Sequence, residues 1–151
     1  MHRAEQIIEA LQSILRARLP SSINVYAHRM LSLGQEAGEL PAVTIDFGED
    51  VATESPGSED LEGTIGSLLT VNITAVVQDA DEQELRRRLL DIRANVHEAV
   101  KFIDDLGLPF VTDTHYGGAL PPEIGTDSDE LVGELTSIWG VRYEMHLLTA
   151  E

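Results

Sequence analysis

One stretch of the chain alternates apolar and polar side chains regularly enough to constrain the whole fold. From residue 69 to residue 77 every odd position is apolar, while positions 70, 72 and 74 carry Thr, Asn and Thr. Successive side chains of a β-strand point to opposite faces of the sheet, so the pattern predicts a strand with one buried and one wet face. The rest of the chain must therefore supply a layer that covers only one face.

Two segments have the spacing of apolar residues that such a covering layer requires. Residues 3–19 carry an apolar stripe at helical spacing, and residues 81–105 carry a longer one. Asp81 and Glu84 resemble a capping box at the start of the second helix, and Gly107 indicates where it ends. The stripes consist of Ile7, Leu11, Ile14 and Leu15 in the first helix, and of Leu85, Leu89, Ile92, Val96, Ala99, Val100 and Ile103 in the second.

Four further strands are predicted from runs rich in β-branched and aromatic residues, at residues 23–26, 41–47, 110–116 and 131–148. The second of these runs places Val43, Ile45 and Phe47 on one face. Gly133 and Gly140 are expected to allow bends or bulges in the long last strand.

The predicted order of elements is helix, three strands, helix, two strands. Both amphipathic helices need an apolar surface to cover, and the sheet offers one such face. We predict a single α+β domain over residues 1–151, with an antiparallel or mixed sheet of about five strands and two helices packed on one face.

Two segments are rich in glycine, proline and acidic residues and predict long loops, at about residues 48–66 and 117–130. Such long connections in a compact domain are usually either disordered or functional. A segment of this kind can become ordered when a partner covers it. The acidic residues of interest in them are Glu49, Asp50, Glu54, Glu59 and Asp60 in the first, and Asp127 and Asp129 in the second.

The chain is strongly acidic, with 27 acidic and 10 basic residues and a net charge of −17. A field of this sign repels phosphate and argues against nucleic-acid binding through a basic face. It is compatible both with simple solubility and with docking to a basic partner. The absence of cysteine excludes disulfides, thiolate nucleophiles and zinc–thiolate sites. Because the apolar runs are interrupted and the first residues are acidic, we expect neither a membrane span nor a signal peptide.

Familiar catalytic and ligand-binding motifs are missing from the sequence. It contains no phosphate-binding glycine loop and no nucleophile elbow, and no two histidines have metal-ligand spacing. Asp113 and His115 share one face of a predicted strand and are interpreted as polar residues of its wet side. Residues 127–130 lack the glycine and the glutamate of a calcium loop, so weak divalent cation binding by the acidic loops is all that is expected. We predict no enzyme activity and no cofactor.

The one basic cluster in the sequence is formed by residues 86–88, within the second predicted helix. Consecutive side chains of a helix point about 100° apart, so these three arginines do not form one patch. We predict ion pairs on the helix surface, and contact with a neighbouring subunit is the alternative. The predicted pairs are Arg87 with Asp91, and Arg88 with Asp81 or Glu84.

Several short sequence motifs occur along this order of elements. An amphipathic helix with residues 7–11 precedes a strand that leads into residues 26–29, and residues 39–45 start a strand directly after Leu-Pro. Residues 69–73 belong to a strand that precedes a helix with acidic first residues, and residues 139–145 belong to a long final strand. Over nearly the whole chain this pattern resembles the tail terminator family of long-tailed bacteriophages, also called minor tail protein U or tail completion proteins.

The resemblance implies a structural, non-enzymatic virion protein. Members of the family form a six-subunit ring that caps the tail tube at the end nearest the head, halts tube polymerisation and offers a surface for joining the head. The implied partners are copies of the chain itself, the tail tube protein and a head-completion or connector protein. The implied location is the head-proximal end of the tail, and the host cytoplasm during assembly.

A closed ring uses two different patches on each subunit, and we expect one in each of the two predicted loops, with the basic cluster as a further candidate for subunit contact. Six such acidic chains would repel one another, so salt or divalent cations are expected to promote assembly. An acidic ring would also let DNA slide through without binding it. The candidate interface residues are Glu49, Asp50, Glu54, Glu59, Asp60, Arg86, Arg87, Asp127 and Asp129.

Three other kinds of protein are compatible with the sequence. A head–tail connector or neck protein would have a similar α+β core. A small enzyme would need a site formed between subunits, with converging polar side chains in a pocket. An adaptor domain would use the acidic surface to bind a basic partner.

Overall fold

The described residues of the protein form one six-stranded sheet with two helices. The computed structural model describes residues 2–27, 39–53, 64–101, 103–127 and 130–146. The α+β class and the packing of both helices on one face are confirmed, with one strand more than expected. In chain order the elements are α1 (Arg3–Arg18), β1 (Asn24–Ala27), β2 (Ala42–Ala52), β3 (Thr64–Asp79), α2 (Glu82–Val100), β4 (Val111–Ala119), β5 (Glu123–Asp127) and β6 (Glu130–His146).

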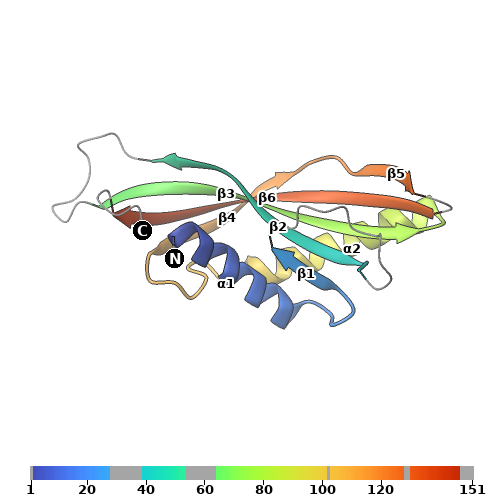
Figure 1. The fold of residues 1–151 in the computed structure, drawn as a ribbon, viewed down its shortest axis with the longest axis horizontal. Helices are drawn as coiled ribbons and strands as arrows, with labels where there is room; N and C mark the ends of the chain where they lie inside the picture. Colours follow the sequence, from blue (N-terminus) through green and yellow to red (C-terminus); the bar gives the residue numbers. More distant parts are fainter. Residues whose placement is uncertain (1, 28–38, 54–63, 102, 128–129, 147–151) are drawn as a thin grey trace.

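The sheet is mixed and has the strand order β1-β2-β3-β6-β4, with β5 paired to β6 beyond β4. Only β1 and β2 run parallel, and the other neighbouring strands are antiparallel. β3 and β6 pair without interruption from Thr64 opposite His146 to Asp79 opposite Leu131. Figure 1 shows the resulting long, twisted sheet, which extends past the helices at the end where β3 begins and β6 ends, while α2 lies alongside its other end. β6 is the central strand, because it has β3 on one side and both β4 and β5 on the other.

The core lies between the sheet and the helices. The odd positions 69–77 of β3 are buried, and Thr70, Asn72 and Thr74 on the other face are partly exposed, as the alternation predicts. α2 packs on β3 and β6, while α1 packs on β1, β2 and α2. We call the side that faces the helices the helix face and the opposite side the helix-free face. On the helix-free face the Oγ1 atoms of Thr74 and Thr136 are hydrogen-bonded, 2.8 Å apart.

The start of α2 follows the predicted cap, but its end does not lie where the sequence places it. The Asp81 carboxylate accepts a hydrogen bond from the Gln83 amide at 3.0 Å. The Asp81 amide donates a hydrogen bond to the carboxylate of Asp79, at 3.0 Å, where a capping box would use the carboxylate of Glu84. The helix ends at Val100, before the predicted end near residue 105. Acidic residues are unfavourable at a helix C-terminus, and Asp105 instead accepts a hydrogen bond from the Gly107 amide, in a turn.

The prediction of two long loops is largely wrong where the structure describes these segments. β2 continues to Ala52 and β3 begins at Thr64, and residues 54–63 lie outside the described residues. In the second segment β4 continues to Ala119, and β5 supplies a strand that the sequence did not predict. Pairing with β6 provides hydrogen bonds that override the weak strand propensity of these glycine-rich residues.

The glycines of β6 were expected to allow bends or bulges, which is wrong. β6 pairs regularly with β3 through both Gly133 and Gly140, and the register shifts lie in β2 and β4 instead. One shift in β4 includes Gly118, whose φ of 117° suits glycine alone. Phe47, predicted on the buried face with its neighbours, is 44% exposed beside the register shift of β2.

Candidate functional site

The structure places the predicted interface residues in separate regions. Glu54, Glu59, Asp60 and Asp129 lie outside the described residues, and Asp127 belongs to β5, with a side chain that is not described. Glu49 and Asp50 are on β2, whereas Arg86 and Arg87 are on α2. Asp50 pairs with Leu69 of β3, and Arg88 donates to the carbonyl of Gln78 on the same strand. Nine residues of strand separate these positions, about 30 Å, so the two pairs do not share one surface.

Asp50 makes its contacts within the chain. Its carboxylate accepts hydrogen bonds from the Tyr143 hydroxyl and from the Ser67 hydroxyl, both at 2.5 Å. Burial and the hydrogen bond to the Asp50 carboxylate raise the pKa of Tyr143 to about 12. Tyr143 and Ser67 are themselves buried, so this cluster ties together β2, β3 and β6 at one end of the sheet.

The basic cluster of α2 is largely paired on the helix surface. The predicted pair of Arg87 with Asp91 is confirmed at 2.7 Å, and the hydrogen bonds from Arg87 also hold the pKa of Glu84 below its ordinary value. Arg86 pairs with Glu82 at 3.0 Å. The predicted partners of Arg88 are wrong: it pairs with Asp79 at 3.4 Å, because its side chain turns back toward the end of β3.

Asp113 and His115 lie on one strand face, as the sequence predicts, and they also contact each other. The carboxylate of Asp113 is 3.1 Å from Nδ1 of His115 and 4.0 Å from Nε of Arg142. Both members of the pair are about half exposed. In the part of the chain that the structure describes, no group of three or more histidine, aspartate or glutamate residues is arranged to hold a metal ion.

Five large apolar side chains of the described residues are exposed, and three of them mark two further regions of the surface; the other two are Phe47 and Leu120. Val51 is 52% exposed on β2, while Leu90 on α2 is 53% exposed and Tyr116 on β4 is 36% exposed. Val51 stands opposite Leu68 on the helix-free face, next to the exposed Glu49. We call Glu49 and Val51 the β2 patch.

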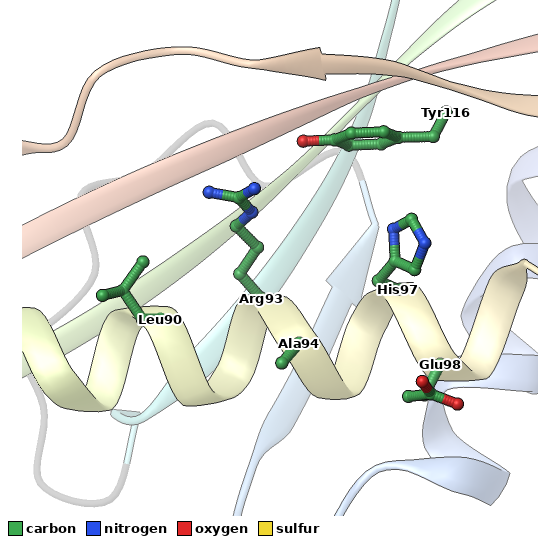
Figure 2. Close-up of a pocket in the computed structure, with 6 residues that line it drawn as sticks. All are labelled: Leu90, Arg93, Ala94, His97, Glu98 and Tyr116. Carbon is green, nitrogen blue, oxygen red and sulfur yellow. The ribbon is translucent and has the colours of Figure 1, made fainter.

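The second region is a groove of about 480 Å³ between α2 and the edge strand β4. Figure 2 shows Leu90, Arg93 and His97 extending from one side of α2 toward the strand that carries Tyr116. These three helix residues are spaced three and then four apart, so they share one helix face. The α2–β4 groove is lined by Leu90, Arg93, Ala94, His97, Glu98 and Tyr116.

An aromatic cluster anchors one wall of this groove. The His97, Tyr116 and Trp139 rings contact one another: the centroid of His97 is 5.0 Å from that of Tyr116 and 5.4 Å from that of Trp139, and the latter two are 5.3 Å apart. Trp139 is buried, and its indole nitrogen donates to the Ser137 hydroxyl at 3.3 Å. Ser137 in turn donates to the Ile73 carbonyl on β3 at 3.2 Å. The aromatic wall is therefore anchored to the sheet through Trp139.

Arg93 differs from the other arginines of the described residues. Within these residues its guanidinium has no hydrogen-bond or ion-pair partner, whereas each of the others contacts a carboxylate or a backbone carbonyl. The paired residues are Arg3, Arg16, Arg18, Arg86, Arg87, Arg88 and Arg142. A cation between Leu90 and Tyr116 can bind a carboxylate that is flanked by an apolar group.

Sequence reasoning missed this groove, although one signal for it was available. Leu90 lies outside the apolar stripe of its helix and directly follows Leu89, which belongs to the stripe. An exposed leucine with an arginine three positions later and a histidine four beyond that is a second, shorter stripe. Its partner strand could not be identified, because the sequence does not show which strand passes beside α2.

The chain is a two-layer α+β protein, and its candidate site is an open groove at one edge of the sheet. Neither helix in the described part of the chain has the length and apolar character needed to cross a bilayer. No protein-family model matches the chain, and no curated protein has a significantly similar sequence.

Proposed function

We propose that this protein is the subunit of a ring that caps a phage tail tube, stops its polymerisation and provides the surface for joining the head. The resemblance of its sequence to tail terminators suggests the role. The structural observation that supports it is the presence, on one subunit, of two different surface regions that each combine exposed apolar side chains with a charged one, the β2 patch and the α2–β4 groove.

The two patches lie on different parts of the subunit, which supports the proposal. The β2 patch is on the helix-free face, because Val51 pairs with Leu68, whose neighbours Ser67 and Leu69 are buried on the helix face. The α2–β4 groove is on the helix face, at the edge of the sheet formed by β4. Cyclic assembly joins unlike patches of adjacent subunits, so one subunit must carry both halves of the contact.

Negative-stain microscopy of the purified protein tests the assembly. Because every chain carries a net charge of −17, we expect monomers at low salt and six-fold rings as sodium chloride or magnesium is added. A chain that stays monomeric under all these conditions, and forms no ring on tail tubes either, would contradict the proposal.

Addition to a polymerising tail tube protein from the same genome tests the capping role. We expect tubes that stop growing and carry a ring at one end, while tubes without the protein continue to lengthen. Binding to head connectors in place of tube ends would identify the protein as a connector or neck component.

A further inference from the structure

We propose that the α2–β4 groove of one subunit binds the β2 patch of a second copy of the chain, with Arg93 facing Glu49 and Leu90 contacting Val51. This inference rests on the proposed function, because it specifies the contact that would close the ring.

The charge of the groove indicates what it binds. Arg93 has no hydrogen-bond or ion-pair partner in the described ranges, and Glu98, the acidic residue of the groove, is paired with Lys101 at 2.7 Å. The unpaired charge of the groove is therefore positive. A ligand that fits it brings a carboxylate, and the chain itself, with 27 acidic residues, is a ready source of one.

The apolar walls of the groove limit which acidic segment of a second copy can bind there. Leu90 and Tyr116 leave apolar surface exposed around Arg93, so the carboxylate must come with an apolar neighbour. The β2 patch supplies both: Glu49 is exposed with no ion pair among the described residues, and Val51 is 52% exposed two residues later.

The position of β2 makes this patch accessible to another subunit. β1 pairs with β2 only from Ala42 to Ile45, so residues 46–52 have β3 as their one strand neighbour within the described part of the chain. In Figure 1 this end of β2 extends beyond the helices. A strand end that projects in this way can reach a groove on an adjacent molecule.

The contact cannot form within one subunit. Val51 pairs with Leu68, whereas Leu89, the neighbour of Leu90, approaches Gly133, which pairs with Val77. Nine residues of β3 separate these two levels, about 30 Å, and the patches are on opposite faces of the sheet. The pairing is therefore between copies and joins unlike patches, the head-to-tail type of contact that forms a ring when the rotation between subunits closes.

Cysteine cross-linking tests the contact directly, because the natural chain has no cysteine. Chains carrying Leu90→Cys are mixed with chains carrying Val51→Cys under mild oxidation, at the salt or magnesium concentration that gives the most assembly. We expect a disulfide-linked heterodimer, with far less product when Ala80→Cys, at an exposed turn before α2, replaces Val51→Cys. Equal yields for the two mixtures, or no heterodimer at any salt or magnesium concentration, would overturn the inference.

Charge reversal provides a second test, in which a double variant is expected to restore the association that each single variant weakens. Arg93→Glu and Glu49→Arg are each expected to weaken self-association about tenfold, because each places like charges in contact. The double variant restores the pair and is expected to recover most of the loss. Glu9→Arg, the same charge change on the exposed side of α1, is the matched control for Glu49→Arg. Circular dichroism checks that each variant is folded.

The outcomes separate this inference from the proposed function. Rings that cap tubes with equal strength in the wild type and in both single variants would show that the ring closes through other residues. A heterodimer that forms in the predicted orientation, in a protein that does not arrest tube growth, would leave the contact correct and the tail role wrong.

Discussion

The two faces of the central strands are built from alternate residues of the same segments, yet they differ in what stabilises them. On the helix face, Leu69, Val71 and Ile73 are buried beneath the helices. On the helix-free face, Thr74 and Thr136 join β3 and β6 through a hydrogen bond. The first face depends on close packing and the second on solvent-accessible polar contacts. The comparison teaches that equal substitutions one residue apart should have very unequal effects.

The largest difference is expected between Leu69→Ala and Thr70→Ala. Leu69 is fully buried, so its truncation removes apolar contacts and leaves a cavity, at a cost of about 3–4 kcal/mol. Thr70 is partly exposed on the other face, and its truncation is expected to cost less than about 1 kcal/mol. Urea unfolding of both variants measures the difference. Similar losses would mean that the helix-free face is also packed against a further layer.

Replacing two glycines of β6 by alanine compares the same two faces of the sheet, because each substitution adds a methyl group to one of them. A Cβ at Gly133 would lie 2.9 Å from a δ-carbon of Leu89 in the core, and Gly133→Ala is expected to cost about 1–3 kcal/mol. A Cβ at Gly140 would lie 2.5 Å from Nε2 of His115, a half-exposed ring that can turn into solvent. Gly140→Ala is therefore expected to cost less than about 1 kcal/mol, measured by thermal unfolding. A greater loss for Gly140→Ala would show that His115 is fixed in place.

Tyr143→Phe tests the polar cluster at the end of the helix face. Loss of the hydrogen bond to Asp50 is expected to cost about 1–2 kcal/mol at neutral pH. The folded chain holds the phenol proton more tightly than the unfolded chain, whose tyrosine pKa is near 10. This stabilisation is complete below pH 10 and is lost as the pH rises from 10 to about 12. Stability measured across this range should fall more steeply in the wild type than in Tyr143→Phe, and parallel curves would contradict the assignment.

The smallest effect is expected for Thr136→Val on the helix-free face. The substitution keeps the β-branched shape and removes one hydrogen bond, 2.8 Å long, between partly exposed hydroxyls. Because water replaces the lost partner, we expect a change of less than about 1 kcal/mol in urea unfolding. A loss as large as that of Leu69→Ala would show that water cannot reach Thr74.

The parts of the fold that could be predicted are those where one physical pattern dominates. The alternation in β3 and the apolar stripes of α1 and α2 gave the class and the covered face, because burial determines both. β5 was missed because residues 123–127 have little strand propensity and are held by pairing with β6, a contact distant in the chain. The end of α2 was misplaced because Ile103 continues the apolar stripe beyond the last helical residue.

The candidate site could be predicted only in part, and for a similar reason. Glu49 was proposed as an interface residue from its acidic segment, and it now forms half of the proposed contact. Arg93 could not be distinguished from the nine other basic residues, because its lack of a partner depends on where β4 passes beside α2. Pairing within the chain is likewise invisible in sequence, which is why Asp50 was grouped with Glu49.

The central place of β6 has a consequence for biosynthesis. β6 is translated after every other described strand, yet it separates β3 from β4 and β5. On the ribosome, the edge of β3 that pairs with β6 therefore has no partner until residues 130–146 have emerged. During that interval a vacant hydrogen-bonding edge, 16 residues long, is available to any other extended chain nearby. Pairing of β6 with β3 closes this edge.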